Sequence, residues 1–320
     1  HFFVSPIWKR IVRVFLNFVL IFPIAMIIKR WHCDVIYTNT ITVCVGALAS
    51  KIIGKAHIWH IHEILYKHQG IKFDLGSIFS ILLIKKLSTM IITNSKFVEK
   101  KYKPLLPNKK IKAVYQPVNI CNYIPLEFYE LKKMIEQESS FKCVIVGSLH
   151  IGKHQDEAIQ AISVLVKKGL NIKLYIVGSG RPEYQLYLEN LITKNNLKEN
   201  VILLGYIDKP FFIIEQSDVF LMCSRDEAFG RVTIEAMKLG KPVIGSRSGA
   251  TIELIREGFN GLFYNPGDFE ELSQKITILY ENRIFLKQLG ENAQKWATEL
   301  FKEDNYKKDM VSIIKEVIKF

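Results

Sequence analysis

The residues best suited to chemistry fall in one segment, Arg225–Gly249, which reads RDEAFGRVTIEAMKLGKPVIGSRSG. An apolar strand pattern at Val219–Met222 precedes it, and helix signals run from Arg231 until Gly240 and Pro242 end them. This order of strand, loop and helix puts the loop side chains at the carboxyl end of a strand. Open α/β sheets bind their ligands at that edge.

Two carboxylates bracket the junction, Glu227 in the loop and Glu235 about one turn into the helix. Gly230 lies near the helix start, where unpaired amides and the positive end of the helix dipole favour a phosphate. Carboxylates accept charge-assisted hydrogen bonds from vicinal hydroxyls. A lone glutamate is more often a solvated surface residue, but two at such a junction favour a site for a polyhydroxyl ligand that carries phosphates.

A second candidate segment, Val144–Lys153, reads VIVGSLHIGK. Its strand ends at Gly147 and Ser148, and Lys153 stands just before a helix pattern. A lysine there can offset the charge of a diphosphate as a point cation. Taken alone, Lys153 is better explained as a surface residue, so its role depends on the Glu227 segment.

A third candidate is the sequence WHIHE at 59–63. Strand alternation puts His60 and His62 on one face, and two histidines at that spacing supply two metal ligands at most. The chain has no D-x-D sequence and no P-loop, so we expect no metal ion and no cofactor. His62, at the end of its strand, is instead expected to face a ligand.

Short apolar strands alternate with helical patterns along the chain, which predicts right-handed βαβ crossovers and parallel sheets covered on both faces. We expect a first domain at 1–125, a linker at 126–140, a second domain at 141–298 and a final helix at 299–320. The ten expected strands are Val35–Thr38, Ala56–Ile61, Met90–Thr93, Ala113–Gln116, Cys143–Val146, Lys173–Val177, Val201–Leu203, Val219–Met222, Pro242–Gly245 and Gly261–Phe263.

Composition and charge limit the classes of molecule that this chain is expected to bind. With 320 residues, 49% hydrophobic and 23% charged, the chain is neither disordered nor fibrous. Residues 1–113 hold eighteen Lys and Arg against four acids, so the whole excess of positive charge lies there. A one-sided basic surface favours a polyanion or, more simply, solubility. No RNA-binding signature is present, so we expect an anionic membrane surface rather than nucleic acid.

An apolar run, Val14–Ile28, opens the chain between basic residues and is interrupted by Asn17 and Pro23. Its 15 residues are fewer than the roughly 20 that a membrane span usually needs. Two interpretations remain open, a helix buried in the core, which is favoured, and a basic apolar helix lying on a membrane. The five scattered cysteines form no C-x-x-C pair, which is typical of a reduced, cytosolic protein.

The spacing Glu227-x7-Glu235, followed by GKPVIGS and SGA-x-x-E, resembles the C-terminal domain of retaining GT-B glycosyltransferases of the family-4 type, the glycosyl transferases of group 1. The segment VGSLHIGKHQDEAI supports the resemblance, which covers 140–295 strongly and 34–120 moderately. It implies an α/β, GT-B architecture: two Rossmann-like domains with parallel sheets facing a cleft, and a final helix that crosses back to the first domain. It also implies sugar transfer from a nucleotide diphosphate with retention of configuration and without a metal ion.

The resemblance assigns catalytic roles to Glu227, His62 and Lys153. Glu227 would contact hydroxyls of the donor sugar, His62 would approach that sugar, and Lys153 would face the diphosphate. Glu235 would hold the ribose, and the backbone amides of 229–231 would point toward sugar and phosphate. The full set expected to bind the donor is Gly147, Ser148, Lys153, Tyr206, Phe229, Gly230, Arg231 and Glu235.

Some positions depart from the family pattern. Ser148 stands where the family often has arginine, which leaves Lys153 as the main cation. Ala250 replaces the second glycine of the usual S-G-G, and the usual turn N-G-V-D reads QPVN at 116–119. Nothing before Val35 matches the opening strand and glycine-rich loop of the family, so the first domain is expected to be incomplete.

The expected reaction moves a sugar from a UDP- or GDP-sugar to a saccharide or lipid-linked acceptor, in bacterial cell-surface polysaccharide or glycolipid biosynthesis. The expected place is the inner face of the cytoplasmic membrane, where the basic first third would dock and high salt would release it. Two alternatives stay open. A nucleotide-sugar 2-epimerase on the same architecture would need no acceptor, and a non-catalytic nucleotide-sugar-binding or scaffold protein would have no activity to lose.

Overall fold

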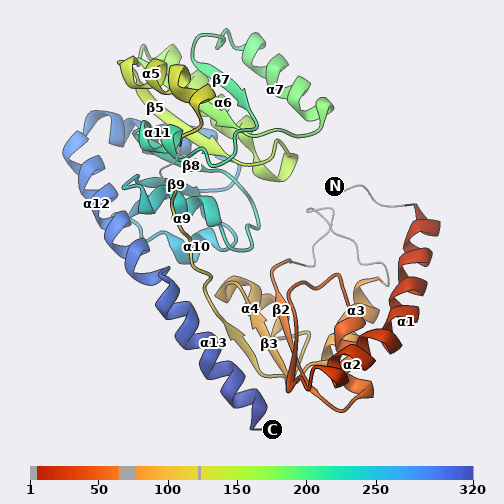
Figure 1. Cartoon of the computed structure of the whole chain (residues 1–320). Helices are drawn as coiled ribbons and strands as arrows, with labels where there is room; N and C mark the ends of the chain where they lie inside the picture. Colours follow the sequence, from red (N-terminus) through yellow and green to blue (C-terminus); the bar gives the residue numbers. More distant parts are fainter. Residues whose placement is uncertain (1–5, 65–75, 122–123, 320) are drawn as a thin grey trace. The chain divides into compact units, whose positions relative to one another are not determined.

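The structure is a computed structural model that describes residues 6–64, 76–121 and 124–319. The chain forms two compact units, one of His1–Gln116 with Glu303–Phe320 and one of Pro117–Lys302 (Figure 1). Each unit is built on one sheet, and every strand pair in both sheets is parallel. The α/β class with two parallel sheets is therefore confirmed.

The first unit has a four-stranded sheet in the order β1-β2-β3-β4. The last helix of the chain, α13, returns to this sheet, where its Ile313 and Val317 pack against Ile58, Met90 and Ile92 (Figure 1). The elements are α1 (Ile7–Arg30), β1 (Val35–Thr38), α2 (Val45–Ile52), β2 (Ala56–Ile61), α3 (Ser77–Leu87), β3 (Met90–Thr93), α4 (Lys96–Tyr102), β4 (Ile111–Ala113) and α13 (Glu303–Ile318).

The second unit has a six-stranded sheet in the order β10-β9-β8-β5-β6-β7. Its core is one large apolar cluster in which the strands pack against α6 and α11. The strands are β5 (Phe141–Val146), β6 (Ile172–Val177), β7 (Val201–Gly205), β8 (Val219–Met222), β9 (Val243–Ser246) and β10 (Gly261–Tyr264). The helices are η2 (Leu126–Phe128), α5 (Tyr129–Gln137), η3 (Ile151–Lys153), α6 (Gln155–Lys167), α7 (Pro182–Lys194), α8 (Phe211–Glu215), α9 (Arg231–Lys238), α10 (Thr251–Leu254), α11 (Phe269–Glu281) and α12 (Arg283–Leu300).

Residues 126–140, which the sequence predicts to be a linker, are largely helical in the structure. They fold as η2 and α5, and Ile135 of α5 is fully buried. The polar run that suggested a connection is the outer face of an amphipathic helix, and α5 belongs to the second unit, which begins at Pro117. Clustered polar residues mark solvent exposure, which a loop and an amphipathic helix share.

The interpretation of the apolar N-terminal segment as a helix buried in the core is wrong. Helix α1 has 24 residues, longer than the apolar run itself, because its basic ends continue the helix. It is long and apolar enough to cross a membrane, with a mean hydropathy of 2.5 over 18 residues, yet only 17% of that stretch is buried. Only Ile21, Ala25 and Ile28 are buried, and they pack around Ala49 of α2.

Two buried histidines in β2 predict acid sensitivity of the first unit. Burial lowers the pKa of His57 to about 4 and, with a smaller contribution from His62, that of His60 to about 3. The unfolded chain takes up these protons near pH 6.5 and the folded chain does not. The two neutral rings therefore contribute fully to the stability of the fold above pH 6.5. As the pH falls toward 4, the free energy of unfolding decreases by about 2.7 kcal/mol per pH unit for two protons.

Hydrogen exchange of β2 and β3 amides between pH 7 and pH 4.5 measures this loss. His60→Gln should remove about half of the slope, and His32→Gln, at an exposed position, should leave it unchanged. Equal protection across this pH range would contradict the prediction.

Candidate functional site

The site lies where the strand order of the second sheet reverses. β5 and β8 are neighbours, and the chain continues from β5 to β6 and β7 on one side and from β8 to β9 and β10 on the other. The loops that follow β5 and β8 therefore diverge at the carboxyl edge of the sheet. In doubly wound sheets this switch point is where ligands bind.

The loop after β5 carries the lysine. Gly147 follows the strand directly, and a Cβ placed on it would lie 3.8 Å from Cε of Lys153. The η3 turn is closed by His150, whose Nδ1 accepts a hydrogen bond from the Gly152 amide at 3.0 Å. Ser148 is exposed, and its carbonyl accepts a hydrogen bond from the buried Gln155 side chain at 2.9 Å. The turn thus folds the Lys153 side chain back over the end of β5.

The loop after β8 is shaped by two glycines. Gly249 has φ +61°, and a Cβ there would lie 2.4 Å from the backbone nitrogen of Glu227. The Ala250 amide donates to the Glu227 carbonyl at 2.7 Å. Gly230 caps α9 with φ +78°, and a Cβ there would lie 2.9 Å from the Leu254 side chain. These close backbone contacts fix where the Glu227 side chain leaves the loop.

The two loops meet through an ion pair. Nζ of Lys153 lies 2.7 Å from Oε2 of Glu227, and the two side chains are 30% and 19% exposed. The sequence positions are 74 residues apart, so the fold alone brings them together. A cation and a carboxylate that both reach solvent at a switch point can serve a ligand that carries both anionic and hydroxyl groups.

Helix α9 begins at this loop and holds the second carboxylate. Glu235 is 6% exposed, and Nε of Arg231 donates to its Oε1 at 2.9 Å. Burial raises the pKa of Glu235, and the Arg231 guanidinium opposes that rise. The Phe229 side chain packs edge-on against Phe301, so its side chain lies in the core.

Glu157 is a central residue that sequence reasoning missed. It is buried in the first turn of α6, where its carboxylate accepts hydrogen bonds from Arg225 at 2.5 Å, from the Tyr264 hydroxyl at 2.9 Å and from the Gly267 amide at 3.3 Å. Nδ1 of His154 lies 3.3 Å from the same carboxylate. Glu157 thereby ties together the loops after β5, β8 and β10. The signal in the sequence is a glutamate on the apolar face of the α6 pattern, since a buried carboxylate requires partners.

Two predicted site residues are not brought to this pair by any described contact. Tyr206 is 71% exposed and follows β7, three strands away from β8, which is about 14 Å of sheet. His62 belongs to the first unit.

Within the first unit, His62 lies at the carboxyl edge of the sheet. Its ring centroid lies 4.0 Å from that of His60, on the same face as strand alternation predicts, and its Nε2 lies 2.8 Å from the Asn39 side-chain oxygen. Burial lowers the pKa of His62, and the Glu63 carboxylate opposes that effect. The neutral ring is thus favoured at neutral pH. In residues 6–64, 76–121 and 124–319, no three His, Cys, Asp or Glu side chains form a group that could hold a metal ion.

Comparison with known proteins identifies the family of this chain. The family model described as glycosyl transferases group 1 matches residues 130–296. The chain is 28% identical over 214 residues to N-acetyl-alpha-D-glucosaminyl L-malate synthase of Bacillus anthracis, which covers 67% of this chain and 55% of that protein. It is 30% identical over 261 residues to glycosyltransferase MJ1178 of Methanocaldococcus jannaschii, covering 79% of this chain and 67% of that one. The chain thus spans between half and two thirds of these relatives.

Solved structures show the same fold. Anabaena HepE, solved in complex with UDP, matches with a TM-score of 0.80 at 23% identity, over 93% of this chain and 82% of that chain. A glycosyltransferase from Rickettsia africae matches with a TM-score of 0.82 at 20% identity, over 95% and 82%. Because the family model covers the switch-point loops and both glutamates, and because the relatives share more than the second unit, the chain belongs to the group 1 glycosyl transferases.

Proposed function

We propose that this chain transfers a sugar from a nucleotide diphosphate donor, a UDP- or GDP-sugar, to a saccharide or lipid-linked acceptor. The observation that carries the proposal is the Lys153–Glu227 pair at the switch point of the second sheet. A lysine suits the diphosphate, and a carboxylate suits the hydroxyls of a sugar attached to it. The pair therefore matches both halves of such a donor.

In the proposed reaction the bond between the anomeric carbon and the diphosphate breaks, and the acceptor oxygen bonds to that carbon. Lys153 and the first-turn amides of α9 would stabilise the charge on the departing diphosphate, which takes up the acceptor proton. Glu227 would orient the sugar through its hydroxyls. His62, neutral at pH 7, would contribute a hydrogen bond from the first unit. These groups supply the electrostatic stabilisation without a metal ion, and we propose retention of anomeric configuration.

The relatives support a nucleotide-sugar donor and a role in polysaccharide biosynthesis. HepE has been solved with UDP-glucose, and a 31% identical relative over 154 residues is the capsular polysaccharide biosynthesis glycosyltransferase CapM of Staphylococcus aureus, which covers 47% of this chain and 39% of that one. We therefore propose a role in cell-surface polysaccharide biosynthesis. The basic first third supports peripheral association with the inner face of the cytoplasmic membrane, where lipid-linked acceptors are found.

The test is binding of a nucleotide panel followed by turnover. Titration calorimetry with UDP, GDP, ADP and the sugar diphosphates should give one preferred base. Incubation of the preferred donor with a lipid-linked disaccharide should give a product whose anomeric configuration NMR reads directly. An epimer formed from donor alone, or no nucleotide binding, would overturn the proposal.

Glu235 yields a prediction about the ribose. Glu235→Ala should weaken UDP binding about 10- to 100-fold, because a buried carboxylate that accepts hydrogen bonds from ribose contributes about 1.5–3 kcal/mol. Calorimetry with UDP and with 2′,3′-dideoxy-UDP separates this effect from a general loss. The variant and the parent should bind the dideoxy compound equally well. An equal loss for both nucleotides would place Glu235 elsewhere.

A further inference from the structure

Helix α1 exposes an apolar surface that no described part of the chain covers. Between Ile11 and Ile27 its outward side chains are all apolar except Arg13, and several are more than half exposed. The most prominent, Phe15, Phe22 and Met26, are 66%, 67% and 67% exposed. The exposed members of this face are Ile11, Val12, Phe15, Leu16, Phe18, Val19, Leu20, Phe22, Met26 and Ile27. A contiguous apolar surface of this kind marks a site of interaction.

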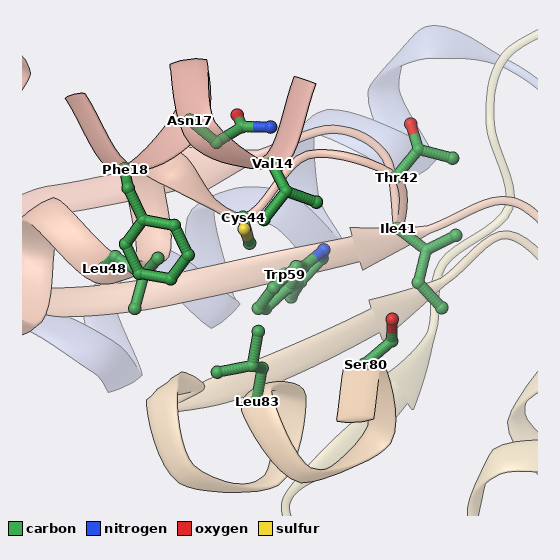
Figure 2. A pocket seen from close by; sticks show the side chains of 10 residues that line it. All are labelled: Val14, Asn17, Phe18, Ile41, Thr42, Cys44, Leu48, Trp59, Ser80 and Leu83. Carbon is green, nitrogen blue, oxygen red and sulfur yellow. The ribbon is translucent and has the colours of Figure 1, made fainter. Parts of the chain in front are cut away.

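The opposite side of α1 packs against the rest of the first unit. Ile21, Ala25 and Ile28 pack around Ala49 of α2. One turn earlier, Val14 and Asn17 line a pocket whose other walls come from α2, β2, α3 and the loop before α2 (Figure 2). The C-terminal half of α1 is thus held against the unit along one side, and its outward face is left available.

Helix α3 extends the same surface. Its Ser80 and Leu83 line the pocket opposite Val14 and Phe18 of α1 (Figure 2). On its outer side Ile78 is 82% exposed, and Phe79 and Leu82 are nearly half exposed. The pocket thus lies between α1 and α3, and we call the exposed apolar side chains of these two helices together the α1–α3 face.

Basic and indole side chains surround the α1–α3 face. Trp8 and Trp31, 60% and 73% exposed, stand at the two ends of α1. The cations at its margin are Lys9, Arg10, Arg13, Lys29 and Arg30 of α1 and Lys85 and Lys86 of α3. Tryptophan prefers the boundary between hydrocarbon and headgroups, and Lys and Arg prefer anionic headgroups.

The charge also decides between a bilayer and a second copy of the chain. Residues 1–113 hold eighteen Lys and Arg against four acids, so two copies that met through this face would oppose like charges. An anionic bilayer offers the opposite charge around an apolar interior. Because Ile21, Ala25 and Ile28 fix the C-terminal half of α1 to α2, we expect the helix to lie in the interface plane and not to span the membrane.

We propose that the α1–α3 face docks the chain on an anionic lipid bilayer, with the apolar side chains of α1 inserted below the headgroups and the basic margin on them. This deepens the proposed membrane association and rests on the proposed function only for its purpose, the access to a lipid-linked acceptor. If charge alone held the protein, high salt would release it from the membrane. With insertion of apolar side chains, we expect part of the protein to stay bound at high salt.

Flotation with vesicles tests the proposal. The probe is phosphatidylglycerol mixed with phosphatidylcholine, compared with phosphatidylcholine alone, at 0.1 and 0.5 M NaCl. The parent chain should float with the anionic vesicles, and a fraction should stay bound in 0.5 M NaCl because apolar burial is not screened. Fluorescence of Trp8 and Trp31 should be quenched by brominated acyl chains. The double variant Phe15→Glu with Phe22→Glu should lower the partition coefficient at least tenfold.

The control is Ile284→Glu, a change of the same kind at an 83% exposed position on α12 of the second unit, which should float like the parent. Far-UV circular dichroism and thermal melting of every variant show that both units are folded, and UDP binding separates this proposal from the proposed function. Unchanged flotation of the Phe15/Phe22 variant, or complete release in 0.5 M NaCl, would overturn insertion. Dimers that require Phe15 and Phe22, without vesicle binding, would instead assign the face to a second copy.

Discussion

Glu227→Gln is expected to reduce the rate of sugar transfer about 100- to 1000-fold, the size of effect that follows when one preorganised electrostatic group is removed from an active site. The Glu227 backbone is fixed by Gly249 and Ala250, so the amide of glutamine should occupy the same place. What the substitution removes is the charge that holds Lys153 and that, in the proposed reaction, would order the sugar hydroxyls. Initial rates with the preferred donor and acceptor measure the loss.

Nucleotide binding should respond in the opposite direction, which makes the prediction specific. In the parent chain the Lys153 ammonium is engaged by the Glu227 carboxylate at 2.7 Å, and in the proposed site a diphosphate would have to compete for it. Without that carboxylate, UDP should bind as tightly as before or a few-fold more tightly, whereas Lys153→Ala should weaken UDP binding. Calorimetry on the two variants gives both answers.

Glu199→Gln, at an exposed position before β7, is the matched control and should keep parental rates and affinity. Parental transfer by Glu227→Gln would contradict the assigned role. So would a fall in UDP affinity as large as that of Lys153→Ala, because it would indicate a general collapse of the loop.

The strands of the fold could be predicted because each is a short apolar run bounded by turn residues. Val35–Thr38, Ala56–Ile61, Met90–Thr93 and Val219–Met222 occupy the expected positions without change. The fourth strand, expected at Ala113–Gln116, is instead Ile111–Ala113. Its exposed Lys112 interrupts the apolar pattern, because β4 lies at the edge of the sheet, where one face of a strand meets solvent.

The sequence predicted where Lys153 and Glu227 lie on their own strands, but not that the two residues form a pair. Each residue could be placed at the end of a strand from its own segment, but which strands are neighbours is a property of the sheet order. β5 pairs with β8 although the whole segment 147–218, which forms β6 and β7 on the other side, lies between them in the sequence. The exposure of α1 was less predictable still, since a buried core helix and a membrane-facing helix have the same apolar composition.

Glu157 was missed because the local pattern does not show its partners, and its substitution gives the largest change in stability that we expect at neutral pH. Glu157→Ala is expected to lower the free energy of unfolding of the second unit by about 3 kcal/mol, because it leaves the buried Tyr264 hydroxyl and the Arg225 guanidinium without their acceptor. For a unit of this size that corresponds to a fall in melting temperature of about 6–12 °C. Arg225 is 42% exposed and can be rehydrated, which keeps the loss at the lower end of the range for a broken buried pair.

Activity should fall further than folding alone explains, since Glu157 is a positioning residue for the Lys153–Glu227 pair. The Arg225 amide donates to the Gly152 carbonyl at 3.3 Å, so the loops of the pair are joined through the same residues that Glu157 holds. Below its melting temperature the alanine variant should show a lower kcat with KM for the donor changed less, because the loops would sample arrangements in which the pair is apart.

Glu157→Gln separates the two effects. The glutamine keeps an acceptor for Tyr264 and for the Gly267 amide but loses the charge that holds Arg225, so it should recover about half of the stability and less of the kcat. Differential scanning calorimetry and steady-state kinetics of both variants, with Glu199→Ala as the exposed control, provide the numbers. If both variants have the melting temperature of the parent, the Glu157 carboxylate does not hold the three loops together. The arrangement of Lys153 and Glu227 must then depend on the glycine contacts at 230 and 249 alone.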